Sequence, residues 1–152
     1  MNGFWLLVHM IGFVLWIGGG IASMVSGVVA KGFAPAERLK AYKITGTVQR
    51  LLVAPGAAAA VFSGVILILG GPYMHTGEMP GWLNVMMGAG ILGAVVAIGA
   101  SLPTATRLAR LEVDARGELP EVFYTLRKRQ AIMATMAGSL ALVALFAATL
   151  GR

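Results

Sequence analysis

The chain has 152 residues, of which 58% are hydrophobic and 12% are charged, whereas soluble domains carry about 25% charged residues. This excess of apolar side chains excludes an ordinary soluble domain. Nearly all basic residues lie in two stretches between apolar runs, which argues against nucleic-acid binding despite the net charge of +6. Cysteine is absent, which excludes disulfides, thiolate metal sites and cysteine nucleophiles.

The sequence predicts four membrane-spanning helices, because a span needs roughly 20 mostly apolar residues and four stretches meet that length. These stretches cover residues 4–30, 51–71, 82–106 and 131–151. Continuous apolar runs without alternation favour helices over a β-barrel. We therefore expect one all-α domain over residues 1–152, a four-helix bundle whose partner is the lipid bilayer. The first stretch has no basic segment before it, so we expect a retained helix rather than a cleaved signal peptide.

The first apolar stretch carries a single ionisable side chain, His9. Ionisable groups at membrane depth are costly and usually face the interior of a bundle. At helical spacing His9 shares one face with small residues and a tryptophan, which lets another helix or a flat cofactor approach closely. This face holds His9, Gly12, Trp16, Gly19, Ser23 and Gly27. His9 is therefore either a hydrogen-bonded structural residue or a functional one that binds heme or copper or transfers protons.

The connections between the apolar stretches differ in charge. Residues 31–50 include five basic residues and 107–129 include six, whereas 71–81 contain neither lysine nor arginine. Because basic loops stay in the cytoplasm, we expect both termini on the non-cytoplasmic side of a bacterial inner membrane. Gln49 lies at the end of the first basic stretch and Gln130 directly after the second, and we expect both to be interfacial anchors rather than site residues.

The second basic connection is long enough to fold, and we expect a cytoplasmic helical hairpin over residues 104–130. Residues 104–115 extend the third helix in this interpretation. Arg116 and Gly117 form the turn, and Pro120 opens the fourth helix.

Small residues recur at four-residue spacing in every predicted span, which allows close helix packing in lipid. The pattern predicts packing within the bundle, with a homo-oligomer or partner-helix seam as the alternative. The residues concerned are Gly19, Ser23 and Gly27, then Gly56, Ala60 and Gly64, then Ala89, Gly93 and Ala97, and finally Ala134 and Gly138.

Possible metal ligands gather on the predicted outer side. His75 and Met79 lie in the connection without basic residues, Met86 lies early in the third stretch, and His9 is near the start of the first. Imidazole and thioether groups suit copper, especially Cu(I), and histidine with methionine is also a heme ligand pair. The same residues are therefore candidates for copper and for heme.

The first stretch also contains a recognisable pattern, His-x-x-Gly-x-x-x-Trp-x-Gly-Gly, formed by His9, Gly12, Trp16, Gly18 and Gly19. It resembles the opening helix of several related bacterial membrane families. These include the HemJ-type protoporphyrinogen oxidases, the copper-resistance CopD domain and small integral membrane proteins of the same kind.

The second and third stretches extend this resemblance. Pro55 and Gly64 resemble the proline and glycine of the second HemJ helix, and Trp82 with Leu83 opens the third helix as in that family. The chain has Met86 at the place of the lysine that follows the Trp-Leu pair in HemJ proteins. The resemblance implies a helical bundle that binds b-type heme through His9, with Met86 as the second ligand by hypothesis and Trp16 and Gly12 beside the cofactor.

Three functions follow as hypotheses. The first is a heme-associated membrane protein with an electron-transfer or redox role, which includes a heme-dependent oxidoreductase. The second is copper binding or passage through His9, Met86, His75 and Met79. The third is a non-catalytic scaffold or accessory subunit that binds partner helices.

Overall fold

The computed structural model describes residues 2–72 and 78–151, and the described chain is helical, without strands. Its α-helices are α1 (Asn2–Val29), α2 (Pro35–Val48), α3 (Ala54–Leu69), α5 (Gly81–Val96), α6 (Leu102–Ala109) and α7 (Glu121–Thr149). The 3₁₀ turn η1 (Ala30–Gly32) follows α1, the π-helical turn η2 (Gln49–Val53) joins α2 to α3, and a second π turn, η3 (Ala97–Ser101), joins α5 to α6.

Four continuous helices are long and apolar enough to cross a membrane, as the sequence predicted. We call them the spanning helices, and they cover Gly3–Gly32, Pro35–Leu69, Gly81–Ala109 and Glu121–Thr149. The second begins at Pro35 rather than near residue 51, because the polar residues that we expected to form a loop form α2 instead. Pro35 suits a first helical turn and good helix formers follow it, so the helix begins well before the chain becomes apolar.

The connection between the third and fourth spanning helices departs from the expected hairpin on one side only. The third helix ends at Ala109 rather than continuing to residue 115. A side-chain oxygen of Asp114 accepts the amides of Arg116 and Glu118 at 2.8 Å, and Gly117 has a φ of 77°. This Asp-stabilised turn competes with the helix, which explains its early end.

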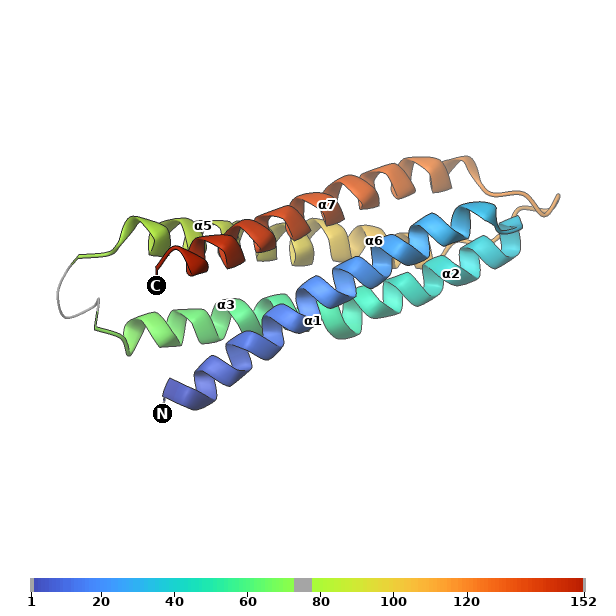
Figure 1. Cartoon of the computed structure of the whole chain (residues 1–152). Helices are drawn as coiled ribbons and strands as arrows, with labels where there is room; N and C mark the ends of the chain where they lie inside the picture. The colour runs from blue at the N-terminus through green and yellow to red at the C-terminus, as the bar shows by residue number, and fades with distance from the viewer. Residues whose placement is uncertain (1, 73–77, 152) are drawn as a thin grey trace.

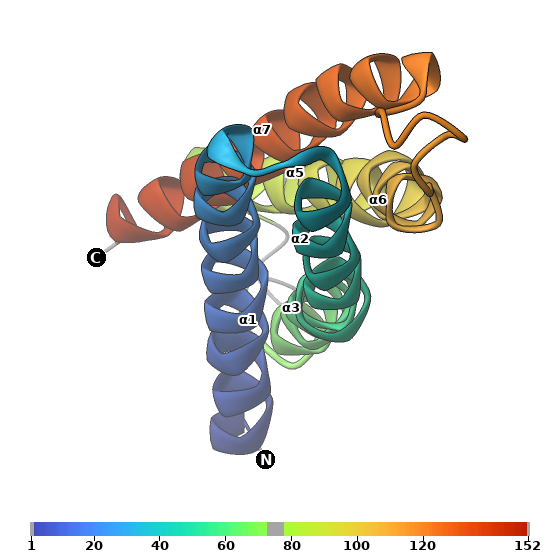
Figure 2. The same cartoon turned by 90° about the vertical axis from the view of Figure 1, so that its right-hand side faces the viewer.

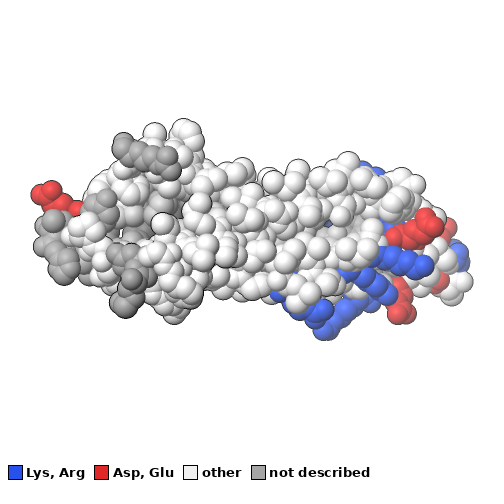
Figure 3. Space-filling view, turned by 60° about the horizontal axis from the view of Figure 1, so that its bottom comes forward, with Lys and Arg blue, Asp and Glu red and all other residues white. Residues whose placement is uncertain are grey.

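The helices form two layers, α1 with α2–α3 and α7 with α5–α6 (Figures 1 and 2). α1 packs mainly on α3, and α5 mainly on α7. α1 begins and α7 ends at the same end of the bundle, which we call the terminal end (Figure 1). Lysine and arginine side chains gather at the opposite end (Figure 3), which we call the basic end; it comprises the connections 30–34 and 110–120 with the helix turns beside them.

Each of the two middle spanning helices contains a π-helical turn, wider than an α-helical one, that ends two residues before a proline. The Ala54 amide bonds the Gln49 carbonyl and the Leu102 amide bonds the Ala97 carbonyl, in each case five residues back. Pro55 and Pro103 lack an amide hydrogen, and a proline ring collides with the carbonyl four residues before it. The wide turns remove that collision without breaking either helix.

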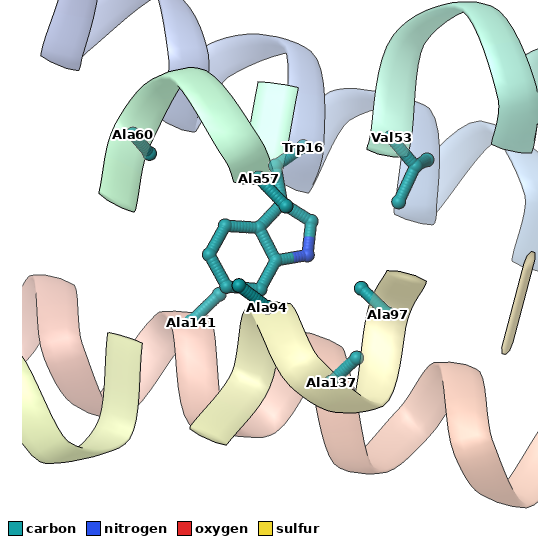
Figure 4. Close-up of a cluster of buried hydrophobic side chains, with 8 residues drawn as sticks. All are labelled: Trp16, Val53, Ala57, Ala60, Ala94, Ala97, Ala137 and Ala141. Atoms are coloured by element: carbon teal, nitrogen blue, oxygen red, sulfur yellow. The ribbon is translucent and has the colours of Figure 1, made fainter. Parts of the chain in front are cut away.

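Trp16 is the centre of the core. It is 2% exposed and projects from α1 towards alanines of α3, α5 and α7 (Figure 4). A Cβ at Gly93 would lie 3.0 Å from the indole ring, so the glycine leaves room for it. Small residues thus surround one large ring, which lets the two layers approach closely.

Candidate functional site

A cleft in the terminal half of the bundle lies between α1, α3 and α5, where three of the predicted site residues meet. His9 and Trp16 line it from α1, and Met86 lines it from α5. Gly64 of α3 and Met87 of α5 also belong to the lining. The lining is almost wholly apolar, so a soft metal or the face of a porphyrin is a better match than a hydrated ion.

His9 is oriented by α3. Its Nδ1 lies 2.7 Å from the carbonyl oxygen of Ala60 and 3.2 Å from Oγ of Ser63. A carbonyl can only accept, so Nδ1 carries the hydrogen and donates it to Ala60. Ser63, which is fully buried, in turn donates to the Ala59 carbonyl at 2.5 Å. In the neutral ring this leaves Nε2 as the nitrogen with a free lone pair, the usual state of a metal-binding histidine.

Space for the imidazole ring comes from Gly64. A Cβ at that position would lie 3.0 Å from Cε1 of His9. Phe13 packs edge to face against the imidazole with ring centres 5.1 Å apart. The ring is therefore held by a hydrogen bond, a glycine and an aromatic neighbour, which together restrict it to one orientation.

The other predicted site residues lie elsewhere. Gly12 lies in the contact between α1 and α3, where a Cβ would be 2.6 Å from the Ala60 nitrogen, and it does not line the cleft. Met79 is 38% exposed in the segment before α5 and is also outside the cleft lining. His75 lies outside the described residues. Gly12 therefore has a packing role in the structure, and the cleft residues that could act as ligands are His9, Met86 and Met87.

A second group of polar residues was missed by the sequence reasoning. Gln49 and Gln130, expected as interfacial anchors, are 1% and 6% exposed and form a buried cluster with Ser23 and Ser101. Gln130 Nε2 donates to Ser101 Oγ at 2.9 Å, Ser101 donates to Gln49 Oε1 at 3.5 Å, and Gln49 Nε2 donates to Ser23 Oγ at 3.4 Å. Each of the four spanning helices contributes one residue, and we call this group the polar cluster.

The polar cluster depends on the wide turns. Gln49 is the first residue of η2 and Ser101 the last of η3, so both lie where proline has altered the helix. The proline positions were visible in the sequence, but the sequence does not show that the two turns face each other, because this depends on how the helices pack. Oε1 of Gln130 is buried without a hydrogen-bond partner, so this cluster is not fully satisfied.

The cleft suits heme in its ligands more than in its size. Histidine with methionine is a heme ligand pair, but the partly open cleft has a volume of about 40 Å³, far smaller than a macrocycle. Heme would therefore need a wider cleft. No lysine or arginine lies between Arg50 and Arg107 in the sequence, so the carboxylates of a heme have to reach water at the terminal end. A single Cu(I) ion needs no such opening.

No protein-family model, curated protein or solved structure matches the chain. The functional interpretation therefore rests on the geometry of the cleft. The resemblance to the HemJ and CopD families stays a prediction.

Proposed function

We propose that the chain is an integral membrane protein of the bacterial inner membrane that binds b-type heme through His9 and has an electron-transfer or redox role. The observation that carries this proposal is the orientation of His9. Its Nδ1 hydrogen is donated to the Ala60 carbonyl, which leaves Nε2 free in a cleft that Met86 also lines. Met86 is the proposed second ligand. Bound heme would supply one-electron chemistry, and His9 and Met86 would hold it in an apolar surrounding.

The proposed orientation places the basic end in the cytoplasm and the His9 cleft towards the opposite face of the membrane. It is supported by the separation of charge along the bundle, since lysine and arginine side chains gather at the basic end (Figure 3) and none lies between Arg50 and Arg107 in the sequence. Electron partners would then meet His9 from the non-cytoplasmic side.

The heme proposal is tested by the absorption spectrum of the protein purified from heme-replete cells. We expect a Soret band and, after reduction, resolved α and β bands. His9→Ala should remove nearly all bound heme, because His9 is the only histidine in the cleft lining among the residues that the structure describes. Met86→Ala should keep heme bound but change the reduced spectrum, since it removes only the weaker ligand.

Met79→Ala is the matched control, because Met79 is a methionine outside the cleft. Its spectrum should equal that of the unmodified protein. A colourless preparation, or heme that persists in His9→Ala, would show the proposal to be wrong. Size-exclusion profiles and helical circular dichroism establish that each variant is folded.

Copper binding is the second candidate, favoured by the small volume of the cleft and by the presence of His9, Met86 and Met87 in its lining. These soft ligands suit Cu(I). Competition with a Cu(I) chelator should show a site that His9→Ala and Met86→Ala weaken and Met79→Ala leaves intact. Equal binding by all four proteins would exclude the cleft as a copper site.

A further inference from the structure

Two arginines at the basic end differ from every other described cation in the chain. Arg38, in the first turn of α2, and Arg127, in the second turn of α7, are half-buried. All other lysines and arginines that the structure describes are exposed, as expected for residues that keep their charge in water. We call these two residues the arginine pair.

Each member of the arginine pair contacts one of two aromatic rings that pack against each other. Tyr42 and Phe123 are 5% and 0% exposed and pack edge to face with centres 5.3 Å apart. Cζ of Arg38 lies 5.1 Å from the centre of the Phe123 ring, and Nε of Arg127 donates to the Tyr42 hydroxyl at 3.0 Å. The rings therefore hold two guanidinium groups, from two different helices, beside one small patch.

This patch lacks a counter-charge among the described residues. Nε of Arg38 is buried without a hydrogen-bond partner, and neither arginine forms an ion pair with a described carboxylate. Glu37, next to Arg38 in the chain, is exposed. Charges that proteins withdraw from water are normally paired, because an unpaired one carries a large desolvation cost. Two guanidinium groups beside one aromatic pair, without an acidic partner among the described residues, could bind an anion from outside the chain.

We propose that the arginine pair binds the phosphate group of an anionic phospholipid. The planar guanidinium fork matches phosphate oxygens in two-point hydrogen bonds. Exposed lysines and arginines also gather at the basic end (Figure 3), where they would concentrate anionic lipids at the membrane surface. A lipid is favoured over a soluble phosphate for this reason. The proposal is independent of the His9 cleft, which lies in the other half of the bundle.

The test measures the melting temperature of the protein in a non-ionic detergent during titration with phosphatidylglycerol, phosphatidylcholine or inorganic phosphate. We expect phosphatidylglycerol to stabilise the protein, and phosphatidylcholine and inorganic phosphate to have little effect. In the double variant Arg38→Gln/Arg127→Gln, the apparent affinity for phosphatidylglycerol should fall about tenfold or more, since charge-assisted hydrogen bonds are lost.

The matched control is Lys40→Gln/Lys128→Gln, which removes the same charge from exposed positions on the same two helices. It should keep most of the affinity. An equal loss in the control, an unchanged affinity in the arginine variant, or equal stabilisation by inorganic phosphate would each overturn the proposal. If the glutamine variant does not fold, Arg38→Lys/Arg127→Lys replaces it: several-fold weaker binding supports the site and unchanged binding overturns it.

Discussion

Glycine at the contact between α1 and α3 shows how one residue sets the distance between two helices. A Cβ at Gly12 would lie 2.6 Å from the Ala60 nitrogen and 2.8 Å from the Gly56 oxygen. These neighbours are backbone atoms of another helix and cannot rotate away as a side chain can. His9 is one turn from this contact, so its hydrogen bond to Ala60 depends on the same short distance.

Gly12→Ala should therefore destabilise the protein by about 1–3 kcal/mol, the usual cost of overpacking. Gly18→Ala, in the same helix, is the control: a Cβ at Gly18 meets nothing within 4 Å, and alanine favours a helix. Thermal unfolding in detergent measures both. Equal melting temperatures would contradict the close contact of α1 with α3.

At the scale of elements, two proline-linked wide turns bring polar groups together inside an otherwise apolar bundle. η2 and η3 place Gln49 and Ser101 against each other, and α1 and α7 add Ser23 and Gln130. In lipid, a polar side chain without a partner is costly, so each residue of the polar cluster depends on the others. The cluster therefore ties all four spanning helices to one another.

Ser101→Ala removes a group that both glutamines use, and it leaves Gln49 Oε1 and Gln130 Nε2 without their partner. We expect a loss of about 1–3 kcal/mol in the free energy of unfolding. Ser139→Ala, at an exposed position of α7, should have little effect.

A double-mutant cycle between Ser101→Ala and Gln130→Leu isolates the bond that joins η3 to α7. A coupling of about 0.5–2 kcal/mol is the expected result for an interhelical hydrogen bond in a membrane. Additive effects of the two substitutions would mean that this hydrogen bond contributes nothing.

At the scale of the whole molecule, charge divides the bundle into two ends. Glu78 lies before α5, between the second and third spanning helices, whereas Asp114 lies in the connection at the basic end. The proposed orientation places these two residues on opposite sides of the membrane.

The absence of cysteine makes this orientation directly testable, because each introduced cysteine is the only one in the chain. Glu78→Cys should react with a membrane-impermeant maleimide on intact cells. Asp114→Cys should react only after the cells are permeabilised. The reverse pattern would place both termini in the cytoplasm and the His9 cleft towards the inner face.

The four spanning helices were predictable from the sequence because their signal is local. A long apolar run has to become a helix in lipid, where every backbone amide needs a partner within its own segment. The buried face with Trp16 and Gly12 was predictable for the same reason, since helical spacing alone places these residues together. His9 could be singled out because an ionisable group in an apolar run is costly in lipid and usually faces the interior of the bundle.

The remaining features depend on contacts between residues far apart in the chain. The segment that forms α2 was expected to be a loop, because hydropathy indicates which residues can lie in lipid and not which residues are helical. Gln49 and Gln130 appeared as surface anchors because only the packing of four helices, with a wide turn in two of them, buries them together. The cleft lined by His9 and Met86 and the aromatic rings contacted by Arg38 and Arg127 also depend on residues of separate helices. Sequence alone determined which segments are helical spans and which face of the first is buried. Only the tertiary structure decided which polar groups meet, because the rotation and crossing of each helix are set by its neighbours.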